Sequence, residues 1–181
     1  MKKLCVFLAV LLFLGTTFAV SQPVPGKKFE FSTAFSFTSL TLSGETGSDT
    51  FLSLPLRVGY YIWKGLELEP ELMLMKFKGS DAAFNLNGNL SYNFNTSGQL
   101  KPFLLAGAGL GNGIAFGALI EGGTSTNATL LNLGGGVKYV IGTSGAIRLE
   151  YRYTHNRLSK GAPLVQNFNI HQVFIGVALF F

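Results

Sequence analysis

The stretch FNLNGNLSYNF, residues 84–94, alternates apolar and small polar side chains along almost its whole length. Successive side chains of a β-strand point to opposite faces, so this period-two pattern predicts a strand with two unlike faces. One face is apolar and aromatic: Phe84, Leu86, Leu90, Tyr92 and Phe94. The other is polar: Asn85, Asn87, Asn89, Ser91 and Asn93.

Seven further segments are predicted to be strands, and most repeat this alternation. They are residues 29–41, 51–62, 66–77, 102–110, 129–141, 146–153 and 169–181. Residues 102–110, PFLLAGAGL, have no polar face, so the direction of that strand is undecided. Pro55 and Pro70 lie inside two of the segments, and because proline removes a ladder donor, we expect a bulge at either position.

The composition indicates a chain that faces lipid. Charged residues make up 13% of the sequence, against about 25% in a typical soluble domain. No apolar run after residue 20 approaches the roughly 18 residues of a membrane helix. A chain that spans a bilayer without helices must close its strands, because lipid satisfies no free backbone group.

The two faces of the strands separate a membrane barrel from a soluble sandwich. A sandwich would present Lys, Glu and Thr to water, whereas the polar face here is a narrow mixture of Asn, Gly, Ser, Glu and Arg. The apolar face is uniform and aromatic, as on a barrel with lipid outside and a polar interior. We therefore predict an all-β protein, an eight-stranded antiparallel up-and-down transmembrane β-barrel whose interior is filled by side chains.

The N-terminus has the features of a signal peptide. Lys2 and Lys3 precede the apolar run 4–14, and Ala19-Val20-Ser21 gives a small-x-small cleavage site. We predict a signal peptide over residues 1–21 and the barrel domain over residues 22–181. Cys5 lies in the first part, so the mature chain has no cysteine for disulfides, thiol catalysis or metal binding. Without the two signal lysines, 12 basic residues (14 − 2) and 9 acidic residues leave a net charge of +3, scattered along the chain, which gives no support for nucleic-acid binding.

The predicted connections alternate in length, as in small outer-membrane barrels. Short turns are expected at residues 63–65, 96–98 and 143–145, and longer links at 43–50, 78–83, 111–128 and 155–167. The short turns are expected to face the periplasm. Aromatics near the strand ends predict girdles at both interfaces. The apolar patch at 114–120 has two interpretations, a hairpin raised above the membrane or a tip that binds a partner.

The inward-facing charges form the candidate site of the barrel. By strand parity, four basic and four acidic side chains point inward: Arg57, Lys138, Arg148, Arg152, Glu67, Glu69, Glu71 and Glu150. Alternate strand residues lie about 7 Å apart, so the three glutamates on one strand need partners. We predict a balanced ion network in preference to a cation site. The turn lengths place Arg57 across from Glu71 and Lys138 across from Glu150, each pair within ion-pair reach or sharing a partner.

Catalytic chemistry has little support in the sequence. The two histidines are His155, at the start of the last long link, and His171, which parity places on the lipid face. A nucleophile needs an adjacent base, and two lone histidines without cysteine do not make a metal site. We predict no enzyme activity, no cofactor and no metal.

The C-terminal segment VFIGVALFF resembles the end of eight-stranded outer-membrane barrels of the OmpX-like and OmpA-barrel-like superfamily, small porin-family proteins. PFLLAGAGLG similarly resembles the fifth strand of many such proteins. The resemblance covers the mature chain and implies a bacterial outer-membrane location. It also implies that the last strand carries the signal read by the barrel-assembly machinery: Val173, Ile175, Val177, Leu179 and Phe181. Neither histidine here begins the His-x-Ser pattern of lipid A deacylase barrels.

Three functions stay open from the sequence. The first is a structural or surface-interaction barrel, adhesin-like, whose loops contact an unidentified extracellular ligand. The second is a narrow pore or a conduit for lipids or small molecules. The third, with the least support, is a lipid-modifying hydrolase. The expected partners are outer-membrane lipid and the assembly machinery, and the barrel is expected to be a monomer.

Overall fold

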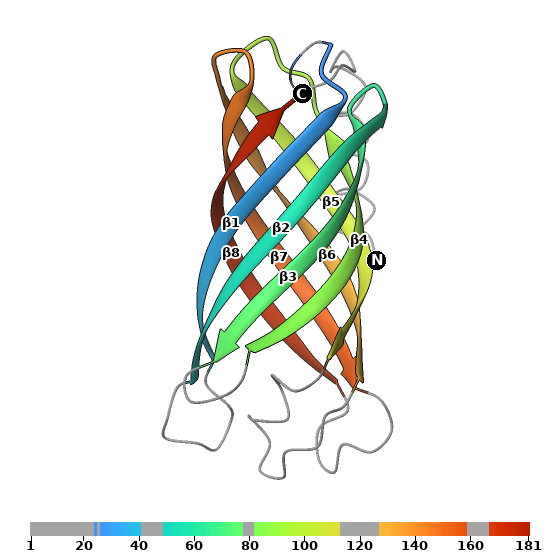
Figure 1. Ribbon diagram of the computed structural model, residues 1–181, viewed down its shortest axis with the longest axis vertical. Helices are drawn as coiled ribbons and strands as arrows, with labels where there is room; N and C mark the ends of the chain where they lie inside the picture. Colours follow the sequence, from blue (N-terminus) through green and yellow to red (C-terminus); the bar gives the residue numbers. More distant parts are fainter. Residues whose placement is uncertain (1–23, 25, 41–48, 78–81, 113–126, 159–166) are drawn as a thin grey trace, which may run out of the picture.

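The computed structural model describes residues 24, 26–40, 49–77, 82–112, 127–158 and 167–181, and these form one closed barrel (Figure 1). Each strand pairs antiparallel with its sequence neighbours, and β1 pairs with β8 to close the barrel. The eight strands are β1 Phe29–Leu40, β2 Asp49–Trp63, β3 Leu66–Phe77, β4 Ala82–Asn93, β5 Leu100–Asn112, β6 Asn127–Ile141, β7 Gly145–Leu158 and β8 Asn167–Phe180. The predicted fold class is confirmed. The described part of the chain contains no helix long and apolar enough to cross a membrane.

The short connections lie at one end of the barrel, at the top in Figure 1, together with the C-terminus. There, Phe29 N–H donates to the Phe181 carbonyl at 3.1 Å, which ties the start of β1 to the end of the chain. At the other end, six strands run two to five residues beyond their predicted bounds: β2, β4, β5, β6, β7 and β8. The apolar patch at 114–120 lies outside the described residues.

The side chains inside the barrel form three layers. An apolar layer at the short-turn end contains Val24, Tyr61, Val140, Ala146, Ala178 and Phe180. Charged side chains fill the middle. A second apolar cluster lies toward the loop end and contains Ala34, Phe51, Met73, Met75, Ala83, Ile170 and Phe174. The interior is therefore a packed core, as the alternation of the strands requires.

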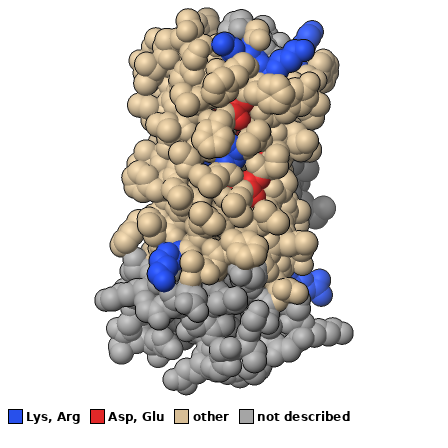
Figure 2. All heavy atoms as spheres, viewed as in Figure 1, with Lys and Arg blue, Asp and Glu red and all other residues tan. Residues whose placement is uncertain are grey.

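The outer wall is apolar and aromatic. Its exposed side chains include Phe29, Phe35, Phe37, Leu86, Leu104, Leu133, Ile175 and Phe181. On the face in Figure 2, lysine and arginine gather toward the two ends, and only small areas of charged atoms show between uncharged side chains at mid-height. Each glutamate whose side chain the structure describes points into the barrel. This separation of charge from the wall is what a surrounding bilayer requires.

The structure shows which side chains of β5 face the lumen and which face outward. Phe103 and Leu105 are buried inside, and Leu104 and Leu110 face outward. The reason is steric: the inward positions at the loop end of β5 are glycines, beside the asparagines of β4. A Cβ at Gly109 would lie 2.6 Å from the Leu86 carbonyl oxygen, closer than real atoms approach.

The expected bulges at Pro55 and Pro70 are wrong. Each proline interrupts one ladder but adds no residue, so the register continues unchanged on the far side. Opposite Pro55, β1 and β2 lose two pairs between Thr33↔Leu56 and Ser36↔Ser53. Opposite Pro70, β2 and β3 lose two pairs between Arg57↔Glu71 and Tyr60↔Leu68. The missing N–H is therefore absorbed as a local gap.

The two register predictions have different outcomes. Arg57 lies across from Glu71, as predicted. Lys138 lies across from Arg148, not Glu150, so the second prediction is wrong by two residues. The cause is a tighter turn, because Ile141 pairs directly with Gly145 and Gly142 adopts a positive φ of 64°. A shift of two preserves the facing direction, so both Lys138 and Glu150 still point inward.

Candidate functional site in the barrel lumen

The middle of the lumen holds the predicted charged residues and one acidic residue more. All eight predicted side chains are buried, and nine ion pairs join them to one another and to Glu30. Glu30, on β1, is 1% exposed. It follows the same inward parity as Ser32 and Ser36, so the alternation of β1 carried the signal that it belongs in the network.

The part of the network toward the loop end is balanced in charge. It contains Arg57, Glu71, Glu150 and Arg152. Glu71 is 2.6 Å from Arg57 Nε and 2.7 Å from Arg152 Nη1. Glu150 is 2.6 Å from Arg152 Nη2 and 3.5 Å from Arg57 Nη2. Two guanidinium groups thus face two carboxylates, an arrangement in which charge-assisted hydrogen bonds are strong.

The part toward the short turns has an excess of carboxylate. Lys138 Nζ is 2.5 Å from Glu30 and 3.0 Å from Glu67. Arg148 is 3.4 Å from Glu30, 3.0 Å from Glu69 and 2.9 Å from Glu150. Arg148 therefore joins the two parts. Lys138 and Glu150 neither contact each other nor share one of these partners, contrary to the prediction.

The whole network contains five carboxylates and four cations, so the expected balance of four against four is off by one. Glu67 and Glu69 each have one cationic partner, Lys138 for Glu67 and Arg148 for Glu69, and Glu67 is the one whose second oxygen is unpaired. Its Oε2 receives Lys138 and the Asn93 amide, at 3.0 and 2.9 Å, while its Oε1 has no hydrogen-bond partner. That oxygen occupies the space over Gly59, where a Cβ would collide with it.

Aromatic rings support the cations from both sides. The ring of Phe103 faces two cations: its centroid is 4.4 Å from the guanidinium carbon of Arg148 and 5.5 Å from Lys138 Nζ. Phe174 receives Arg152 at 5.1 Å and Arg57 at 5.7 Å. Cations over aromatic faces gain stabilisation that grows when water is excluded. The rings also close the space that the charged groups leave.

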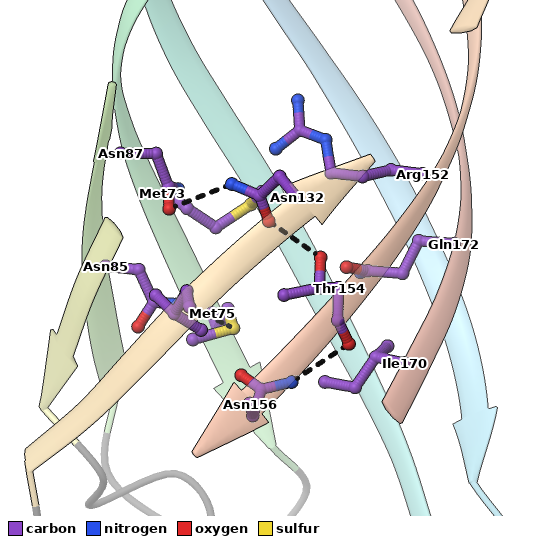
Figure 3. A pocket seen from close by; sticks show the side chains of 11 residues that line it. Met73, Met75, Asn85, Asn87, Asn132, Arg152, Thr154, Asn156, Ile170 and Gln172 are labelled. Atoms are coloured by element: carbon purple, nitrogen blue, oxygen red, sulfur yellow. Dashed lines mark hydrogen bonds between the residues drawn. The ribbon is translucent and has the colours of Figure 1, made fainter. Parts of the chain in front are cut away.

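A small pocket lies on the loop side of the network, at the level of Asn132 and Thr154 (Figure 3). Asn132 donates to Asn87 at 3.2 Å and accepts from Thr154 Oγ1 at 3.0 Å. Arg152 lines the pocket on its inner side and also belongs to the network. The space fits roughly one water molecule, which such an amide-lined site would bind.

Both histidines lie on the outer wall. His155 belongs to β7, not to a loop, because the alternation of β7 continues to Leu158. His171 lies on β8 and faces outward, as parity predicted. His155 Nδ1 is 2.8 Å from Asn169 Oδ1, and His171 Nδ1 is 2.6 Å from the Tyr151 hydroxyl. The barrel wall thus separates the histidines from the described carboxylates, and in the described part no cluster of histidine and acidic side chains could hold a metal ion.

The residues of the predicted assembly signal follow one face of β8. Val173, Ile175, Val177 and Leu179 are exposed on the outer wall, and Phe181 follows the strand with 64% of its surface exposed. The fold thus places an apolar row and a terminal aromatic ring on the lipid side. Their reading by an assembly machinery stays a prediction.

Comparison with known proteins agrees with this architecture. The sequence model of the outer membrane protein beta-barrel domain matches residues 5–181. The fold resembles that of Neisserial surface protein A (NspA), at 19% identity and a TM-score of 0.65, over 84% of this chain and 97% of that one. It also resembles the N-terminal β-barrel domain of Pseudomonas aeruginosa OprF, at 15% identity and a TM-score of 0.54, over 86% and 98% of the two chains. The outer membrane enzyme PagL is similar at 15% identity and a TM-score of 0.53, over 81% and 97%.

The chain therefore belongs to the outer membrane protein beta-barrel domain family, and it is a small eight-stranded barrel of the bacterial outer membrane. The identities to the solved structures are low, so those likenesses concern the fold alone. No curated protein sequence matches this chain.

Proposed function

We propose that this protein is a structural or surface-interaction barrel, which contacts its partners through the segments that join the strands at the loop end. The observation that supports this proposal is the filled lumen. Charged groups from five strands meet at mid-height, and Lys138, Glu150 and Glu69 are each 0% exposed. A transported molecule would have to displace several buried ion pairs, each costly to break.

The narrow pore or conduit has weaker support. The pocket in Figure 3 has room for about one water molecule, and Arg152 on its inner side is held by ion pairs with Glu71 and Glu150. The hydrolase has the weakest support. Catalysis by a Ser–His pair requires the base to be held by a third polar group beside the nucleophile. Here the partners of the histidines are Tyr151 and Asn169 on the outer wall.

The test replaces the connecting segments and leaves the strands intact. Residues 113–126 and 159–166 would each be exchanged for a short Gly-Ser linker, since β5 continues to Asn112 and β8 begins at Asn167. Cells that carry each variant would be compared with the parent for attachment to host-derived surfaces. Outer-membrane levels of the barrel, measured by immunoblot, provide the control.

Loss of attachment at normal barrel level would support a surface-interaction role. Unchanged attachment, combined with greater sensitivity of the cells to detergent when the whole barrel is deleted, would support the structural role alone. Unchanged attachment and unchanged envelope integrity would contradict the proposal.

A further inference from the structure

The outer wall of β7 and β8 breaks the apolar pattern of the barrel near the loop end. We define the outer-wall patch as six side chains on these strands: Tyr151, Tyr153, His155, Arg157, Asn169 and His171. At a similar distance from the short turns, the other strands carry apolar groups that include Phe37, Leu52, Leu74, Phe84, Leu110 and Leu131. Most polar side chains at this height therefore lie on these two adjacent strands, and the outward polar residues elsewhere are Lys76 on β3 and Asn127 and Thr129 on β6, with Thr129 across from Arg157.

The patch is organised by hydrogen bonds. The register places Tyr153 across from His171, and His155 across from Asn169. The Asn169 amide oxygen accepts from the Tyr153 hydroxyl and from His155 Nδ1–H, both at 2.8 Å. Its amide NH2 group is consequently turned away from these two partners. The ring of His171 lies 5.1 Å from that of Tyr153, centroid to centroid.

The height of the patch places it at the outer boundary of the hydrocarbon layer. A tilted strand needs about 9–11 residues to cross that layer. His155 lies about ten residues into β7 from the short turn, and His171 about ten residues from the chain end of β8. Arg157, one step further outward on β7, is exposed beyond this boundary. The patch thus faces lipid headgroups, where hydrogen-bonding side chains are stable.

The backbone beside the patch is also without a ladder partner. β1 and β8 pair only from Glu30↔Phe180 to Phe35↔Ile175, while β7 and β8 pair along nearly the whole of β8. The N–H of Phe181 points toward β1, because it donates to the Phe29 carbonyl. Backbone N–H groups along a strand point alternately to its two neighbours, so those of Val173 and His171 also point toward β1. Among the described residues, these positions have no partner in the β1 ladder. Polar backbone at a membrane surface favours a polar ligand.

We propose that the outer-wall patch binds a saccharolipid of the outer leaflet through its phosphate-bearing sugar headgroup. Arg157 supplies a cation, and the described part of the outer wall carries no carboxylate to oppose an anion. The Asn169 amide and the imidazole rings supply directional hydrogen bonds that suit sugar hydroxyls and phosphate oxygens. This site is independent of the loop segments and of the function proposed above.

The test measures lipid binding to the purified full mature barrel in detergent by native mass spectrometry. Lipid A, a diphosphorylated glucosamine disaccharide, is the probe, and phosphatidylglycerol is the anionic lipid without sugar. The patch variant combines Asn169→Leu with His171→Leu. The control is Lys76→Met, which removes an outward cation near the loop end of β3.

We expect the patch variant to bind lipid A about tenfold more weakly, as befits the loss of one or two hydrogen bonds to a charged group. The control should stay within about twofold. Equal binding by the patch variant, an equal loss in Lys76→Met, or equal affinity for phosphatidylglycerol would each overturn the proposal. If the patch variant does not fold, the unaltered protein decides: labelled histidine ring resonances should shift with lipid A and stay in place with phosphatidylglycerol, and no shift with lipid A would refute the site.

Discussion

Replacing Glu150 by glutamine should destabilise the barrel far more than the same replacement of Glu67. Glu150 contacts three guanidinium groups, those of Arg152 at 2.6 Å, Arg148 at 2.9 Å and Arg57 at 3.5 Å. The neutral amide leaves the loop-side part of the network with two cations and one carboxylate. The NH2 group of the new glutamine would also face the guanidinium N–H groups around position 150, and two hydrogen-bond donors cannot satisfy each other.

The magnitude follows from the contacts that remain. Removing one partner of a buried ion pair costs about 3–5 kcal/mol, because the other charge is left uncompensated. Arg57 and Arg152 keep Glu71, and Arg148 keeps Glu30 and Glu69. We therefore expect the lower end of that range, about 3 kcal/mol, for Glu150→Gln. Glu67 belongs to the part with three carboxylates for two cations, and a glutamine oxygen can still accept from Lys138, so we expect less than about 1 kcal/mol for Glu67→Gln.

The assay is equilibrium unfolding in urea of the barrel refolded in lipid vesicles, followed by the change in electrophoretic mobility between folded and unfolded forms. The two variants have the same change of atoms and charge, so each is the control of the other. Equal losses of unfolding free energy in the two, or a larger loss in Glu67→Gln, would refute the assignment of the excess carboxylate.

Three further predictions concern the wall, the packing and the assembly of the barrel. Trp63, the only tryptophan, is 67% exposed at the short-turn end. Its fluorescence in vesicles should therefore be quenched most by lipids brominated close to the headgroups. Strongest quenching by lipids brominated near the ends of their acyl chains would contradict this position. Gly109→Val, directed into the lumen beside β4, should cost about 1–3 kcal/mol of unfolding free energy. Ala108→Val on the lipid side should stay within about 0.5 kcal/mol, and an equal or larger cost at Ala108 would contradict the direction assigned to β5. Deletion of Phe181 should lower the outer-membrane level of the protein on immunoblots more than the stability of the refolded barrel, and an unchanged level would remove the assembly role from this residue.

Strand parity predicted the architecture and the contents of the lumen because it depends only on local alternation. It placed Glu67, Glu69 and Glu71 inward correctly, since one apolar face fixes the opposite one. The glycine-rich β5 had no such contrast, and its direction follows from its neighbour β4, which local sequence does not encode. The continuation of β7 to Leu158 was missed because its outward residues there are His155 and Arg157, which do not alternate with apolar ones on the lipid side.

The pairing inside the lumen was harder to predict than its composition. The register of β6 and β7 depends on whether three or five residues form the turn, and Gly142 permits the tighter one. A change of two residues keeps every side chain on its face but changes its neighbours. Lys138 consequently pairs with Glu30 across the lumen, a contact between strands that are distant in sequence. Such contacts depend on barrel closure, which no single hairpin specifies.

A planar-bilayer recording of the purified mature barrel tests most directly whether the lumen is sealed. The ion network and its supporting rings fill the cross-section at mid-height. We predict that insertion of the folded protein, confirmed by its heat-dependent mobility in SDS gels, leaves the membrane current at the level of the bare bilayer in neutral buffered salt. Discrete and reproducible conductance steps from the folded barrel would contradict a sealed lumen and favour the pore.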